Sequence, residues 1–121
     1  MFITLCKGKI HRATVTEACL DYRGSITIDE ALLKEAGIKP YELLHINNMS
    51  SAVHWETYAI PGTKGQICLN GCPARLFQVG DEVIIMSFAQ LSTDEAKSFT
   101  HKVVHVDKQN TITYTEELRV E

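Results

Sequence analysis

The sequence has no excess of basic residues, and it has no long hydrophobic run. Its 12 lysines and arginines are outnumbered by 15 aspartates and glutamates, which gives a formal net charge of −3. A protein that binds nucleic-acid phosphates should instead present a basic face. No apolar stretch approaches the ~20 residues of a transmembrane helix, and Lys7 and Lys9 interrupt the N-terminal apolar stretch too early for a signal peptide. We therefore expect a cytoplasmic protein with no nucleic-acid or membrane partner.

Cysteine is scarce as well, with four in 121 residues. The four stand mostly in apolar stretches, where a reduced thiol behaves as a small hydrophobe. Cys68 and Cys72 could join His101 and His105 in a zinc site. However, three residues separate the two cysteines, whereas a tight zinc-binding pair is usually separated by two. We therefore predict buried thiols and no metal.

The chain also lacks repeats, low-complexity tracts and linker-like stretches, so a single domain over residues 1–121 is expected. Short stretches rich in β-branched and aromatic residues predict strands. These stretches are 2–16, 25–28, 43–47, 55–60, 66–69, 82–88, 103–106 and 111–115. Turns are predicted at Pro61-Gly62, Asn70-Gly71 and 79–81, and the last two strands should form a hairpin across 107–110.

Two short helices are predicted between these strands. One covers 29–37, where Asp29 can cap its start and Gly37 can close its end. The other begins near Thr93, a plausible cap followed by acidic residues. Many short strands with two small helices indicate a mainly β fold, a compact barrel with short helical inserts.

The dipeptide Gly24-Ser25 is the first candidate for chemistry. Glycine leaves its carbonyl unshielded, and the hydroxyl of a following serine can approach that carbonyl. Such a pair can undergo an N-to-O acyl shift when the backbone is strained and a donor stabilises the oxyanion. Taken alone, however, a Gly-Ser pair is more often a plain turn.

Several other segments accompany this pair at characteristic spacing. They are residues 9–16, Tyr22, 24–29, 57–60, Asn70-Gly71, 74–76, 79–85 and 103–107. Together, and above all in K-I-H-R, G-S and T-Y, they resemble the pyruvoyl-dependent aspartate 1-decarboxylases over nearly the whole chain.

The resemblance implies a double-psi β-barrel, assembled as a homotetramer with active sites between subunits. It implies autocatalytic cleavage between Gly24 and Ser25, giving chains 1–24 and 25–121. Ser25 would become a covalent pyruvoyl cofactor that forms a Schiff base with the substrate amine and accepts electrons as carbon dioxide leaves. The expected reaction converts L-aspartate to β-alanine, within pantothenate biosynthesis. Whether an accessory maturation factor is a further partner stays open.

The resemblance also assigns roles to individual residues. Ser25 is the nucleophile and later the cofactor, while Thr57 donates to the cleavage oxyanion and contacts substrate. Tyr58 returns a proton, since a phenol with a pKa near ~10 is protonated at neutral pH. Substrate contacts are expected from Lys9, His11, Tyr22, His54, Thr57, Asn70, Gly71, Cys72 and Pro73. Lys9 and His11 should share one face of a strand, because alternate residues point the same way.

The sequence departs from the family pattern where a second substrate carboxylate should be held. His54 stands in place of an arginine, and loss of a bidentate clamp is worth about 1.5–3 kcal/mol of binding. Trp55 replaces a phenylalanine, which predicts a bulkier pocket wall. Cys72 and Pro73 replace alanines, and Pro73 has no N–H to offer a carboxylate.

Three functions therefore remain open from the sequence. Decarboxylation of aspartate is favoured, and the altered clamp allows a less acidic amino acid in a specialised pathway instead. The third is an uncleaved, non-catalytic barrel that acts as a small-molecule binding module. Retention of Ser25, Thr57 and Tyr58 favours an enzyme.

Overall fold

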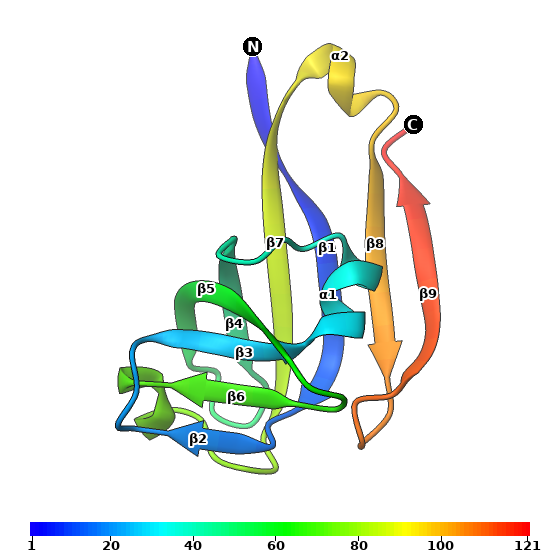
Figure 1. Cartoon of the computed structure of the whole chain (residues 1–121). Helices are drawn as coiled ribbons and strands as arrows, with labels where there is room; N and C mark the ends of the chain where they lie inside the picture. Colours follow the sequence, from blue (N-terminus) through cyan, green and yellow to red (C-terminus); the bar gives the residue numbers. More distant parts are fainter.

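The computed structural model describes all 121 residues and contains nine strands in one mixed sheet, two short α-helices and a 3-10 helix (Figure 1). The strands are β1 (Phe2–Thr14), β2 (Glu17–Cys19), β3 (Ser25–Asp29), β4 (Leu43–Asn48), β5 (His54–Gly62), β6 (Ile67–Asn70), β7 (Glu82–Ser92), β8 (Thr100–Val106) and β9 (Ile112–Arg119). The helices are α1 (Glu30–Ala36), η1 (Cys72–Arg75) and α2 (Thr93–Ala96). The prediction of a mainly β fold with short helical inserts is confirmed.

The strand order is β2-β6-β3-β5-β4-β7-β1-β8-β9. Strand β1 pairs antiparallel with β7 and parallel with β8, while β3 pairs parallel with β5 and antiparallel with β6. In Figure 1 the long strands β1, β7, β8 and β9 run side by side and carry α2 and both termini at one end. Strands β2, β3 and β6 lie across the other end. This crossing of strand groups is consistent with the double-psi barrel expected from the sequence.

Eighteen buried hydrophobic residues form one core cluster inside the sheet. Strand residues on the inner face supply most of it, among them Ile10, Ile26, Leu44 and Ile85, each fully buried. Helix α1 packs closely on β1 at Gly8, where a Cβ atom would lie 2.1 Å from the carbonyl oxygen of Ala36. A glycine is therefore required at the point where helix and sheet meet.

The helix signals are confirmed for α1 and shifted by one residue for α2. The Asp29 carboxylate accepts from the Ala31 N–H at 2.8 Å, and Gly37 ends α1 with a left-handed φ of 72°. The prediction of Thr93 as the cap of the second helix is wrong. Ser92 caps it in a capping box with Glu95, which satisfies two backbone donors reciprocally.

Two turn predictions are corrected by the structure. Pro61 and Gly62 belong to β5, which continues along β3 after its pairing with β4 has ended at Tyr58. The missing N–H of Pro61 is tolerated there because β5 has become an edge on that side. Asn70 is the last residue of β6, and Gly71 leads directly into η1 instead of closing a hairpin.

The predicted burial of the thiols is correct only in part. Cys68 is buried and Cys6 is half-buried, and burial raises the pKa of both thiols. Cys19 and Cys72 are exposed. None of the helices combines the length and the apolar character needed to cross a lipid bilayer.

Candidate active site

The hydroxyl of Ser25 is fully buried and held by one side chain. Asn70 Nδ2 donates to Ser25 Oγ at 2.8 Å and to Thr27 Oγ1 at 2.9 Å. Ser25 and Asn70 are direct partners in the antiparallel β3–β6 ladder, so the strand register itself brings them together. Cys68 Sγ in turn donates to Asn70 Oδ1 at 3.2 Å, which fixes the orientation of the amide.

The backbone of Gly71 lies close to Gly24, the residue before Ser25. A Cβ atom on Gly71 would lie 3.1 Å from Gly24 Cα and 3.1 Å from the Tyr22 carbonyl oxygen. Gly71 also has a φ of 80°, and its N–H donates to the Cys19 carbonyl at 2.9 Å. The structure therefore joins the two predicted dipeptides, Gly24-Ser25 and Asn70-Gly71, in one local unit.

Lys9 and His11 share the outer face of β1, as predicted. Between them Ile10 points into the core with no exposed surface, and alternate residues of a strand face opposite sides. Lys9 has no hydrogen-bond or ion-pair partner within the chain. His11 lies against His105 of β8, with ring centroids 5.3 Å apart, and its buried Nδ1 atom also lacks a partner.

The environment of His11 opposes protonation of its ring. Burial is the main cause that lowers the His11 pKa, and the positive charges of Lys9, His105 and Arg12 lower it further. Glu116 acts in the opposite direction but does not outweigh them. A neutral imidazole can both donate and accept a hydrogen bond, so His11 can serve as a polar wall without carrying charge.

Thr57 and Tyr58 lie on β5 beside β3, on opposite faces of the strand. The first parallel pair of these strands is Ile26 with Ala59, so Ser25 and Tyr58 occupy the preceding positions. Tyr58 therefore points to the same face as Ser25, whereas Thr57 pairs with the buried Leu44 of β4. Neither Thr57 nor Tyr58 makes a side-chain hydrogen bond within the chain, so both hydroxyl groups are free to donate.

The residues that depart from the family pattern are in different surroundings. His54 is exposed on β5, and its Nδ1 atom lies 2.7 Å from Asn47 Oδ1. Trp55, the next residue along the strand, points the other way and packs partly buried against the core, so its place in a pocket wall stays a prediction. Cys72 is exposed at the start of η1, and Pro73 is buried there.

The predicted residues form two groups on different strands of the sheet. Ser25, Asn70 and Gly71 belong to strands β3 and β6 and to the turn after them, and Tyr22 is exposed on the loop before β3. Lys9 and His11 belong to β1, and three strands, β5, β4 and β7, separate β1 from β3 in the sheet. The two groups are not joined by any side-chain hydrogen bond or ion pair within the chain.

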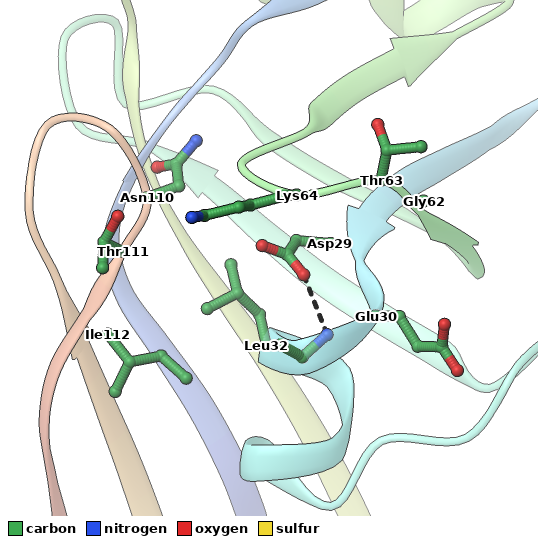
Figure 2. Close-up of a pocket in the computed structure, with 10 residues that line it drawn as sticks. Asp29, Glu30, Leu32, Gly62, Thr63, Lys64, Asn110, Thr111 and Ile112 are labelled. Atoms are coloured by element: carbon green, nitrogen blue, oxygen red, sulfur yellow. Dashed lines mark hydrogen bonds between the residues drawn. The ribbon is translucent and has the colours of Figure 1, made fainter.

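The largest cavity, about 700 Å³, contains none of the predicted site residues. Figure 2 shows it between the start of α1, the β5–β6 turn and the β8–β9 turn. Its main polar groups have structural partners: Asp29 accepts from Ala31 and Gly65, and Asn110 bonds Thr14 and Gly65. The cavity is therefore not the candidate active site.

Sequence reasoning missed two polar residues next to His54. His45 of β4 pairs with Glu56 of β5, and each offers an atom within 4.8 Å of the other and of His54. The only sequence signal is the pair of patterns His45-x-Asn47 and His54-x-Glu56, whose side chains share a face if the two strands are neighbours. By contrast, no three of Cys68, Cys72, His101 and His105 meet at ligand distance.

Comparison with known proteins agrees with the family resemblance seen in the sequence. A family model described as aspartate decarboxylase matches residues 1–113. A protein of Campylobacter jejuni named aspartate 1-decarboxylase is 55% identical over 114 residues, which cover 93% of this chain and 90% of that protein. Proteins of the same name from Carboxydothermus hydrogenoformans and Ruminiclostridium cellulolyticum are 52% identical over 122 residues and 54% identical over 115 residues. The former alignment covers 99% of this chain and 96% of the relative, the latter 93% and 90%.

Proposed function

This chain belongs to the aspartate decarboxylase family, and from that premise we propose that it is a carboxy-lyase that converts L-aspartate to β-alanine and carbon dioxide. We further propose that its cofactor is a covalent pyruvoyl group made from Ser25. The single observation that supports this cofactor best is the buried Ser25 hydroxyl, fixed by Asn70 directly beside Gly24. β-Alanine is a precursor in pantothenate biosynthesis, and such a reaction fits the cytoplasm as its compartment.

The surroundings of Ser25 fit autocatalytic cleavage. In the N-to-O acyl shift the Ser25 oxygen bonds to the Gly24 carbonyl carbon, and the peptide C–N bond breaks. Asn70 holds the oxygen in place, and contact with Gly71 restricts the Gly24 backbone, which lowers the entropy that the reaction must lose. Thr57 would donate to the developing oxyanion, a contribution worth about 2.7–4 kcal/mol in comparable sites. The shift leaves an ester between Gly24 and the Ser25 oxygen. Loss of the Ser25 α-proton with β-elimination would release chain 1–24 as a carboxylate and leave dehydroalanine at the start of chain 25–121, and its hydrolysis with loss of ammonia would give the pyruvoyl group.

Once formed, the pyruvoyl group would supply the carbonyl that bonds the substrate amine and accepts the electrons released with carbon dioxide. The chain's own residues bind the substrate and move its proton. The ammonium group of Lys9, without a partner in the chain, is available to a substrate carboxylate, and His11 lines the same face. The Tyr58 phenol would deliver the proton that replaces the lost carboxylate. Tyr22, Asn70, Gly71, Cys72 and Pro73 would line the other side.

Separation of Lys9 from Ser25 within the sheet supports a site built between subunits. Lys9 has no contact with Ser25 that would join them within one chain, and β5, β4 and β7 lie between their strands in the sheet, so we propose that a second copy supplies one of the two groups. A homotetramer, the family arrangement, would place them together. This assembly is part of our proposal, as is one domain spanning residues 1–121.

A specific observation keeps a less acidic amino-acid substrate as the second candidate. The Glu56 carboxylate lies 3.5 Å from His54 Nε2, so a negative charge occupies the surroundings of the residue expected to hold the substrate's second carboxylate. Two like charges about 4 Å apart repel by about 1 kcal/mol in water and more near a protein surface. Aspartate binding would then depend chiefly on Lys9.

Turnover on a panel of amino acids tests this proposal. The purified, processed protein, supplied with any accessory maturation factor, should release carbon dioxide from aspartate with the highest kcat/KM. The matched Ser25→Ala protein should be inactive on every amino acid. A higher kcat/KM for an uncharged amino acid would instead support the second candidate, a decarboxylase of a less acidic amino acid. Activity in the Ser25→Ala protein would contradict a cofactor made from Ser25. No turnover of any amino acid by the processed protein would instead support the third function, a non-catalytic barrel that binds a small molecule.

A further inference from the structure

Two histidines and a glutamate converge on the outer face of the sheet, outside the machinery that cleaves the chain. His45 and Asn47 lie on β4, and they pair with Glu56 and His54 of the neighbouring strand β5 (Figure 1). All four side chains share one face, because directly opposed residues and alternate residues of a ladder point the same way. The ligand atoms of the two histidines and Glu56 lie within 4.8 Å of one another.

The distances within this group match those between the ligands of one metal ion. His45 Nδ1 lies 3.4 Å from His54 Nε2, and His54 Nε2 lies 3.5 Å from Glu56 Oε2. Two ligands at about 2.0–2.1 Å from a tetrahedral ion lie about 3.3–3.4 Å apart. Two of the three ligand separations are therefore already close to the required value. Glu56 Oε1 lies 3.9 Å from the other His45 nitrogen, Nε2, and rotation of the exposed Glu56 side chain can bring its carboxylate toward Nδ1.

A further contact orients His54 toward the centre of the group. The Asn47 side-chain oxygen can only accept a hydrogen bond, so the Nδ1 atom of His54 carries the proton of their 2.7 Å contact. In the neutral ring, the lone pair then resides on Nε2, the nitrogen that faces His45 and Glu56. A metal-binding histidine usually donates its other N–H in this way. Asn47 is thus placed as an orienting residue behind the ligand.

The surroundings hold the other ring and leave room for an ion to enter. Phe88 meets the His45 ring edge-on, with centroids 4.8 Å apart, which limits its rotation. The exposed fractions of the His45, His54 and Glu56 side chains are 29%, 46% and 53%, so solvent reaches all three. Met86 stands between His45 and the cation Lys9 in the sheet, so no lysine or arginine occupies the adjacent position.

We propose that His45, His54 and Glu56 form a binding site for one divalent transition-metal ion of the zinc class. Two imidazoles and one carboxylate suit Zn²⁺ and Co²⁺ and disfavour Ca²⁺ and Mg²⁺, which prefer oxygen ligands alone. Three protein ligands leave a fourth coordination position open to water or to an anionic ligand such as a carboxylate. Binding requires neutral imidazoles, so protons compete with the ion and the affinity should fall as the pH is lowered.

Titration of the full-length protein with Co²⁺ tests this site, because four-coordinate Co²⁺ has an intense visible spectrum. We expect one ion per chain, at least tenfold weaker binding in His45→Ala and in His54→Ala, and unchanged binding in the matched control His101→Ala. His101 is a β8 histidine whose Nδ1 atom lies 2.8 Å from the Cys6 carbonyl oxygen, outside the cluster.

Three results would overturn the metal site. The first is no saturable binding by the wild-type protein. The second is an affinity in both His45→Ala and His54→Ala equal to that of the wild type. The third is a near-ultraviolet charge-transfer band, which would show that an exposed thiolate holds the ion. The Ser25→Ala protein should bind Co²⁺ as tightly as the wild type, because binding does not need cleavage. Failure of cleavage with metal binding intact would count against the proposed function alone.

Discussion

At the scale of single residues, the candidate site combines one fully engaged side chain with several free ones. Ser25 Oγ is buried and held by Asn70, as expected for a group whose geometry must be fixed before it reacts. Lys9, Thr57 and Tyr58 have no polar partner in the chain. Their hydroxyl and ammonium groups are thus available to substrate or to a second subunit, which is what distinguishes them from structural polar residues such as Asp29.

The Tyr58 hydroxyl is predicted to act after cleavage and not during it. Tyr58→Phe removes the proton donor and keeps the ring, which lies 6.1 Å from the ring of Tyr41. We expect normal processing at Gly24-Ser25 and a kcat for aspartate lowered about 10²–10⁴-fold, the usual contribution of general acid catalysis. Steady-state kinetics and intact mass measure the two effects separately. An unchanged kcat would remove Tyr58 from the proton-transfer step.

His11 should make stability depend on pH in a defined direction. Because burial and nearby cations lower its pKa in the folded state, the unfolded chain binds the proton more readily. This contribution to stability is present above the unfolded pKa of about 6.5 and is lost as the pH falls below it.

The measurement is urea unfolding of Ser25→Ala protein with His11 or with His11→Gln. The Ser25→Ala substitution keeps both samples uncleaved. Between about pH 7.5 and pH 5.5, a range that spans the unfolded histidine pKa, the protein with His11 should lose more stability than the His11→Gln variant. Equal losses in the two proteins would show that His11 titrates as it does in the unfolded chain.

At the scale of secondary-structure elements, the sequence predicts well what depends on neighbouring residues. The caps Asp29 and Gly37 of α1 are confirmed because the interactions that end a helix lie within a few residues. Strand β2 was missed because its three residues are ordered only by pairing with β6, about fifty positions later in the chain. Pro61 was taken for a turn residue because only the completed sheet shows that β5 has a free edge there.

In the candidate site, too, features that depend on neighbouring residues were predictable from the sequence, and features that depend on strand pairing were not. The Gly24-Ser25 and Asn70-Gly71 pairs could be identified from the sequence through the family resemblance. Their direct contact depends on the β3–β6 register. The grouping of His45 with Glu56 could not be predicted, since nothing in the local sequence shows that β4 and β5 align these residues.

The junction of β6 and η1 gives a prediction with an internal control. Gly71→Ala should slow cleavage, because its Cβ would lie 3.1 Å from Gly24 Cα and its backbone has a positive φ. Gly37→Ala imposes a similar φ, 72°, but its Cβ would meet nothing within 4 Å. It should cost about 1–2 kcal/mol of stability and leave the cleavage rate unchanged. The measurement is the fraction of intact chain over time. Equal cleavage rates in Gly71→Ala and wild type would contradict a positioning role for Gly71.

At the scale of the whole molecule, the residues proposed to share one substrate lie on different parts of the sheet. Ser25 on β3 and Lys9 on β1 have three strands between them in the sheet order. The proposed assembly of identical chains would bring a Lys9 and a Ser25 from different chains to one site. It would also explain why Lys9, Thr57 and Tyr58 have no polar partner within one chain.

Mixed assemblies test this arrangement. Lys9→Ala protein and Ser25→Ala protein should each have little or no activity, but their co-expression should restore activity, because some sites then combine an intact Lys9 with an intact Ser25 from different chains. A chain with both substitutions, co-expressed with Ser25→Ala, controls for assembly and should be inactive. Activity of the mixture no greater than the sum of its parts would place the whole site within one chain.

The proposed activity depends on one chemical event, the conversion of Ser25 into an N-terminal carbonyl group. Intact-mass spectrometry of a preparation that decarboxylates aspartate tests it most directly. We predict two chains, residues 1–24 and residues 25–121, and a larger chain that has no free N-terminal amine and carries a ketoacyl group. A preparation that is fully active yet consists of one unbroken chain of 121 residues would contradict it.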